Sequence, residues 1–100
     1  MRRVAILGAG GMGTALALLF DKGGAEVKLW SRDPEQAQQL TMTRVNRRHL
    51  PGIELPRSVR ITAAVFEAAH DAELIVAAIP TSYLRATLSA LAPELLLYFF

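Results

Sequence analysis

The sequence contains no cysteine, which excludes disulfides, thiol nucleophiles and thiolate metal sites. A surplus of one charge is also missing, since eleven basic and nine acidic residues leave a net charge of only +2. The strongly basic balance typical of nucleic-acid-binding domains is therefore absent. Apolar residues make up 52% of the 100-residue chain, as in globular proteins. We expect one small globular domain, cytoplasmic, with no nucleic-acid partner.

A long, strongly apolar run is missing as well. Residues 4–20 follow Arg2 and Arg3 in the manner of a secretion signal, but glycines and a threonine dilute the segment. No small-x-small cleavage site follows Phe20, and the stretch is shorter than the roughly 20 apolar residues needed to span a bilayer. The sequence predicts neither export nor a membrane partner.

Apolar runs alternate with helical patterns along the chain. Strands are expected at residues 3–7, 26–30, 59–62 and 73–80. Helices are expected at residues 11–22, at 34–44, from a Thr62 cap through His70, and after Thr81 or Ser82. Strands that alternate with helices predict an α/β fold, a doubly wound and mostly parallel sheet with helices on both faces.

Local signals set the expected ends of these elements. Asp33 is a typical N-cap before Pro34, and the pair at residues 23–24 predicts a left-handed glycine stop. Two prolines and the lack of any sustained period predict a loop over residues 45–58. In the last helix, the spacing predicts sheet-facing side chains at Tyr83, Leu84, Leu88 and Leu91.

The chain ends on the apolar segment ELLLYFF, residues 94–100, which has no assigned structure. No helix follows that could cover a further strand, so the sheet is expected to be incomplete at its C-terminus. The six apolar residues at the end of the chain contain no charged side chain, and such a tail, where exposed, favours self-association.

The segment GAGGMG places Gly8, Gly10 and Gly13 between the first predicted strand and the first predicted helix. This is the position of a dinucleotide-binding fingerprint, and it predicts a Rossmann-like fold. Gly8 allows a tight turn, Gly10 lets the backbone approach a pyrophosphate, and Gly13 lets the helix pack on the strand. The alternative is a glycine-rich turn that binds nothing.

The end of the second strand carries Ser31 and Arg32 where NAD-binding proteins place an acidic residue. A hydroxyl removes the repulsion toward a 2′-phosphate, and a guanidinium can bind that phosphate through two hydrogen bonds. Such a contact favours NADP over NAD by roughly tenfold to a hundredfold. The alternative is that Arg32 pairs with Asp33 or Glu35 on the surface. We therefore expect NADP or NAD as the cofactor, with NADP preferred.

Four stretches of the sequence resemble one family: GAGGMGTALA (8–17), VKLWSR (27–32), RVNRRHLPGIELP (44–56) and AAIPTSYLR (77–85). They are similar to the bacterial NAD(P)-dependent glycerol-3-phosphate dehydrogenases, and the third is the most specific. The resemblance implies that the cofactor lies along Gly8, Gly10, Gly11, Met12 and Gly13. It further implies that Ser31 and Arg32 lie at the adenosine ribose and Pro80 near the nicotinamide.

The resemblance implies a partial NAD(P)-binding domain over residues 1–93. Full family members interconvert glycerol 3-phosphate and dihydroxyacetone phosphate for phospholipid synthesis, with substrate-binding and proton-transferring lysines from a second domain. Here the only lysines are Lys22, expected at the end of a helix, and Lys28, expected on the surface of a strand, so neither is expected to be a catalytic base. We therefore expect a truncated, frameshifted or fragmentary oxidoreductase that is inactive alone, with no catalytic residue and a phosphorylated substrate bound only in a full-length form.

The sequence departs from the family at Gly11-Met12, where a hydroxyl and a large ring are usual, and at His49, where an aromatic residue is usual. His49 and His70 lack spaced carboxylates, so no metal site is expected. One alternative is another Rossmann oxidoreductase, such as a ketopantoate-reductase-like or hydroxyacid dehydrogenase. Another is a non-catalytic module that binds a dinucleotide or a partner chain.

Overall fold

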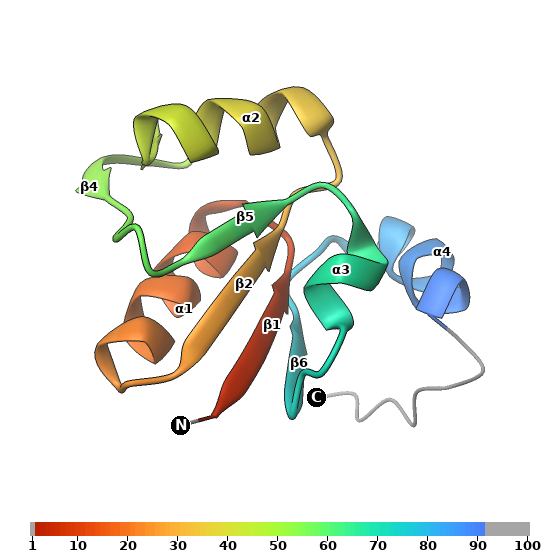
Figure 1. Cartoon of the computed structure of the whole chain (residues 1–100). Coiled ribbons are helices and arrows are strands. Elements are labelled where there is room, and N and C mark those ends of the chain that lie inside the picture. The colour runs from red at the N-terminus through yellow and green to blue at the C-terminus, as the bar shows by residue number, and fades with distance from the viewer. Residues whose placement is uncertain (1, 92–100) are drawn as a thin grey trace.

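A sheet of four parallel strands forms the centre of the computed structural model, which describes residues 2–91 except the side chains at 81 and 88–91 (Figure 1). The strands are β1 (Arg3–Leu7), β2 (Glu26–Trp30), β5 (Arg60–Thr62) and β6 (Leu74–Ala77). Their order across the sheet is β5-β2-β1-β6. The chain therefore builds outward from β1 on one side and then crosses to the other. This reversal beside β1 is a topological switch point, and open α/β sheets bind ligands outside the carboxyl ends of the strands at such a point.

Helices cover both faces of the sheet, which confirms the doubly wound α/β architecture. They are α1 (Gly11–Lys22), α2 (Pro34–Thr43), α3 (Val65–Ala69) and α4 (Thr81–Leu91). Ala17 of α1 and Leu40 of α2 share one buried cluster, whereas Ala68 of α3 belongs to a second cluster on the opposite face. Figure 1 shows α4 beside α3.

The two clusters follow from the alternation of side chains along a strand. In β1, Ile6 contributes to the α1–α2 face and Leu7 to the α3 face, and both are fully buried. In β2, Leu29 and Trp30 divide in the same way. Trp30 also donates its indole N–H to the carbonyl of Ala63 at 3.0 Å, so the only tryptophan is a packed side chain. Strands buried on both faces explain why the sequence shows continuous apolar runs.

The predicted loop at residues 45–58 is wrong in part, because the chain forms an antiparallel hairpin there. Its strands are β3 (Val45–Asn46) and β4 (Leu50–Glu54). Residues 51–54 are exposed, so β4 has no apolar alternation by which the sequence could signal a strand. The hairpin is anchored by Arg44, whose guanidinium donates to the carbonyl of Val59 at 2.6 Å.

The helix termini confirm two expectations and correct one. The Asp33 carboxylate accepts from the Glu35 amide at 3.0 Å and caps α2. The left-handed glycine after α1 is Gly24, whereas Gly23 has an ordinary φ of −76°. Thr62 does not cap α3, which begins later; its hydroxyl accepts from the Ala64 amide and braces the preceding turn.

The last helix also departs from its expected orientation. Tyr83 is 41% exposed rather than packed on the sheet, and Leu84 is half-buried. The side chains of Leu88 and Leu91, and the apolar segment 94–100, lie outside the described residues. No helix in residues 2–91 is long and apolar enough to cross a membrane.

Candidate functional site

The loop that leaves β1 lies between the ends of its two neighbouring strands. The Gly8 amide donates to the carbonyl of Trp30 at 2.9 Å, and the Ala78 amide donates to the carbonyl of Leu7 at 2.8 Å. The glycine motif is thus fixed by backbone hydrogen bonds on both sides. It lies at the carboxyl end of the sheet, where open α/β folds bind their ligands.

Two of the three motif glycines are required by the fold itself. Gly8 has a φ of +123°, and a Cβ there would overlap the carbonyl of Ala78. A Cβ on Gly13 would overlap the carbonyl oxygen of Gly8, because α1 lies directly against the end of β1. Any side chain at either position would push the helix or the turn out of place.

Gly10 is different, because nothing in the protein requires a glycine there. Its φ is −78°, and no atom lies within 4 Å of the position that a Cβ would occupy. A residue with ordinary dihedrals and open space in front of it tolerates a side chain. The backbone of Gly10, which is the N-cap of α1, is therefore open to approach from outside the chain.

The start of α1, directly after Gly10, presents an electropositive surface. The first helical hydrogen bond runs from the Thr14 amide to the carbonyl of Gly10 at 3.0 Å, so the amides of Gly11, Met12 and Gly13 precede it. No side chain caps this terminus, and its first turn has no acidic residue. These amides and the helix dipole favour an anion.

Two side-chain amides hold the glycine loop from below. The Ala9 carbonyl accepts from Gln36 Nε2 at 3.0 Å and from Asn46 Nδ2 at 2.8 Å. Asn46 also donates to the Thr14 hydroxyl at 2.9 Å, which in turn donates to the carbonyl of Gly10 at 2.7 Å. This network joins α2 and the hairpin to the loop and fixes its conformation before any ligand binds.

Gln36 belongs to the candidate site, although no motif in the sequence marks it. Its position four residues before the buried Leu40 places both on one face of α2, and this spacing was the available signal. Its amide also accepts from Ser31 Oγ at 2.6 Å. Gln36 therefore connects the glycine loop to the end of β2.

The hairpin packs against the start of α1. A Cβ built on Gly11 would lie 3.1 Å from the carbonyl oxygen of His49, so little space remains between them. The His49 amide donates to Asn46 Oδ1 at 3.3 Å, which ties the hairpin turn to the network. Met12, 72% exposed, projects from the same helical turn and offers apolar surface to a ligand.

The end of β2 separates the two residues expected at the ribose. Ser31 is fully buried, and its hydroxyl donates to Gln36 and to the carbonyl of Asp33. Arg32 is exposed, and its guanidinium carbon lies 3.6 Å from the ring centroid of Tyr83. The alternative pairing of Arg32 with Asp33 or Glu35 is not among the ion pairs of residues 2–91.

The remaining expected residues lie away from the glycine loop. Pro80 is exposed between β6 and α4, and its carbonyl accepts from the Tyr83 amide at 2.9 Å. Lys22 is exposed at the far end of α1. Lys28 donates to the carbonyl of Glu67 at 3.1 Å and is held on the α3 side of the sheet. The described residues include no group of three or more side chains that could hold a metal ion.

A cavity of about 240 Å³ opens at the amino end of the strands, opposite the glycine loop. Arg3, Glu26, Arg60 and Asp71 are among the residues that line it, so its charges are mixed. Ligands of open α/β sheets bind at the carboxyl edge, so the glycine loop at that edge is the candidate functional site.

Known proteins match this chain over nearly its whole length. The family model described as NAD-dependent glycerol-3-phosphate dehydrogenase N-terminus matches residues 3–96. Two relatives, both glycerol-3-phosphate dehydrogenases named for NAD(P)+, come from Thermus thermophilus and Chlorobium phaeobacteroides. The first is 46% identical over 91% of this chain and 28% of its own length. The second is 42% identical over 87% of this chain and 26% of its own.

A solved structure gives the same result for the fold. The glycerol-3-phosphate dehydrogenase of Coxiella burnetii superposes with a TM-score of 0.85 at 28% identity, over 90% of this chain and 28% of that one. The chain thus spans about a quarter of the length of the proteins it matches.

Proposed function

The chain belongs to the NAD-dependent glycerol-3-phosphate dehydrogenase family through its N-terminal domain, and from this premise we propose that it binds and positions a dinucleotide cofactor for hydride transfer between glycerol 3-phosphate and dihydroxyacetone phosphate. The bound cofactor supplies the hydride chemistry, and the protein supplies its binding and orientation. The observation that carries the proposal is Gly10, a glycine that the fold does not require beside helix amides that favour an anion.

The pyrophosphate is assigned to the amides of Gly11, Met12 and Gly13, with Gly10 allowing close approach. The open space above Gly10 and the uncapped, uncharged start of α1 support this assignment. Met12 then covers apolar surface of the ligand. Pro80 is assigned to the nicotinamide end because it follows β6, on the other side of the switch point from β2.

The adenosine ribose is assigned to Ser31 and Arg32. Since the Ser31 hydroxyl is already engaged with Gln36, we propose that Ser31 contributes by shaping the end of β2. Arg32 keeps its guanidinium exposed and is the residue that prefers the 2′-phosphate of NADP over the 2′-hydroxyl of NAD.

The wider role of the protein is also proposed. The cofactor-binding domain is assigned to residues 1–93, in the cytoplasm, with residues 94–100 outside it. A small phosphorylated substrate binds only in a full-length form, and the chain alone is inactive. The edge strand β6, with Leu74 43% exposed, supports self-association of the chain. The family match does not favour a ketopantoate-reductase-like enzyme, a hydroxyacid dehydrogenase or a non-catalytic module.

The test is a titration of the purified chain with NADPH and NADH at one fixed salt concentration. The emission of Trp30 reports binding, because this single tryptophan lies directly before Ser31 at the end of β2. Gly10→Ala places a methyl group where the pyrophosphate must approach. We expect at least about tenfold weaker binding of both cofactors, or about 1.4 kcal/mol.

Gly23→Ala is the matched control. Gly23 also has an ordinary φ, and a Cβ there would lie 3.5 Å from the nearest atom, at the opposite end of α1. This variant should bind as the wild type does, and circular dichroism should show both variants folded. A folded wild-type chain that binds neither cofactor, or a Gly10→Ala chain with unchanged affinity, would refute the proposed function.

A further inference from the structure

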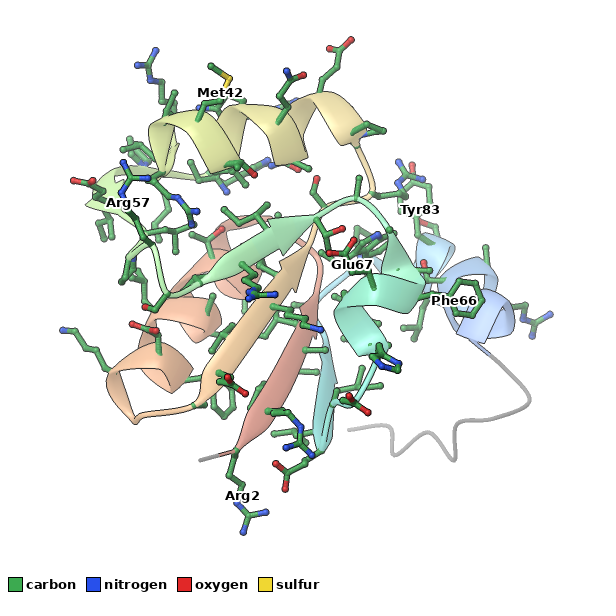
Figure 2. All side chains as sticks on the ribbon, viewed as in Figure 1. Arg2, Met42, Arg57, Phe66, Glu67 and Tyr83 are labelled. Carbon is green, nitrogen blue, oxygen red and sulfur yellow. The ribbon has the colours of Figure 1, made fainter. Side chains whose placement is uncertain are left out.

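The guanidinium of Arg32 does not lie free at the end of β2 but stacks on an aromatic ring from a distant part of the chain. Its carbon lies 3.6 Å from the centroid of the Tyr83 ring. Arg32 follows β2, whereas Tyr83 lies in α4, after β6. Figure 2 shows Tyr83 beside the segment that joins β2 to α2. We propose that Tyr83 is a positioning residue that sets the preference for NADPH over NADH by holding Arg32 in place.

The stack leaves the binding edge of Arg32 available. A guanidinium is planar, and its five N–H donors point outward within that plane. When its flat face lies on an aromatic ring, the attraction of the cation for the ring holds it without using any of those donors. The donors remain for the two-point hydrogen bonding that a phosphate accepts.

An ion pair would hold the same side chain differently. The carboxylate of Asp33, directly beside Arg32, is engaged with the Glu35 amide at the start of α2. A carboxylate partner would also occupy the donors that a 2′-phosphate needs, and it would add negative charge beside that phosphate. Tyr83 holds the guanidinium without occupying its donors and without adding negative charge. Its contribution is therefore specific to NADPH, the cofactor with a 2′-phosphate.

This inference rests on the proposed function and goes beyond it by assigning a residue outside the glycine motif to cofactor choice. NADH has no 2′-phosphate, so the position of Arg32 affects its binding little. Loss of the ring should therefore change the ratio of the two affinities. A merely structural role of Tyr83 would instead weaken both cofactors alike or neither.

The experiment compares three variants of the chain in the Trp30 titration. Tyr83→Leu removes the ring and should weaken NADPH about threefold while NADH changes by less than about 1.5-fold, as expected for an exposed cation–ring contact. Tyr83→Phe retains the ring and should restore the wild-type ratio. Phe66→Leu is the matched control, since Phe66 is an exposed aromatic residue of α3, and it should leave both affinities unchanged.

A second measurement addresses the stack directly. Ring currents of Tyr83 should shift the Hδ proton resonances of Arg32 in the NMR spectrum, and Tyr83→Leu should remove that shift whereas Phe66→Leu should not. In an Arg32→Ala background, Tyr83→Leu should no longer change the ratio of affinities.

The possible failures are distinguishable. If the wild-type chain binds neither cofactor, the proposed function fails and this inference fails with it. If the wild type binds both, the inference alone is overturned when Tyr83→Leu leaves the ratio of NADPH to NADH affinity unchanged, including by weakening both cofactors equally. It is likewise overturned when Tyr83→Leu changes that ratio to the same extent in the Arg32→Ala background. It is also overturned when Tyr83→Phe loses the preference, because the hydroxyl would then be responsible.

Discussion

The shared acceptor beneath the glycine loop makes a quantitative prediction. The carbonyl of Ala9, a residue only 5% exposed, accepts hydrogen bonds from both Gln36 and Asn46. Replacing either residue by alanine leaves the carbonyl with the other donor. Replacing both leaves a buried carbonyl without either of its side-chain partners. We therefore expect the double variant to lose more stability than the sum of the two single variants.

The expected magnitude follows from the hydrogen bonds involved. Gln36→Ala also removes the bond from Ser31 and should cost about 2 kcal/mol, and Asn46→Ala, which also removes the bonds to Thr14 and from the His49 amide, about 3 kcal/mol. Leaving the Ala9 carbonyl unpaired adds about 1–2 kcal/mol in the double variant. The total is a large part of the roughly 5–15 kcal/mol that stabilises a chain of this size.

The assay is urea unfolding of the wild type, both single variants and the double variant, followed by Trp30 emission. The coupling energy is the difference between the loss in the double variant and the sum of the single losses. Gln39→Ala is the matched control, because this α2 glutamine donates to the carbonyl of Val45 and does not contact Ala9. The losses of stability caused by Gln39→Ala and by Asn46→Ala should add in the variant that carries both. Losses for Gln36 and Asn46 that add to within about 0.5 kcal/mol would refute the reasoning.

Two further substitutions test the local geometry. Gly13→Ala should destabilise the chain by about 2–3 kcal/mol, since its methyl group would meet the paired backbone of Gly8; urea unfolding measures this, and wild-type stability would contradict it. Asp33→Ala removes the cap on the Glu35 amide and should cost about 1 kcal/mol, or about 4–8 °C in Tm by thermal circular dichroism, whereas Asp33→Ser should retain most of the stability. Equal losses for alanine and serine would exclude capping as the cause.

Much of the fold could be predicted because its signals are local in the sequence. Strands β1 and β2 span their apolar runs, and Gly8 marks the end of β1. The paired glycines at 23–24 mark the end of α1. The capping of α2 by Asp33 follows from three consecutive residues. The hairpin could not be predicted in this way, because β4 is exposed and pairs only with the short β3, so it has no buried face to impose an alternation.

The parts of the site that escaped prediction depend on contacts between distant segments. Helical spacing shows that Tyr83 and Leu84 follow a period, but it does not show which residue of that period faces the sheet. The ring of Tyr83 lies against Arg32 instead of the sheet, a contact that the spacing does not predict. Gln36 looked like an ordinary helix residue, because nothing near it in the sequence reveals that the Ala9 carbonyl lies above it. A glycine motif thus marks a candidate phosphate site, whereas the residues that hold the motif, and those that we propose to choose the cofactor, are determined by tertiary packing.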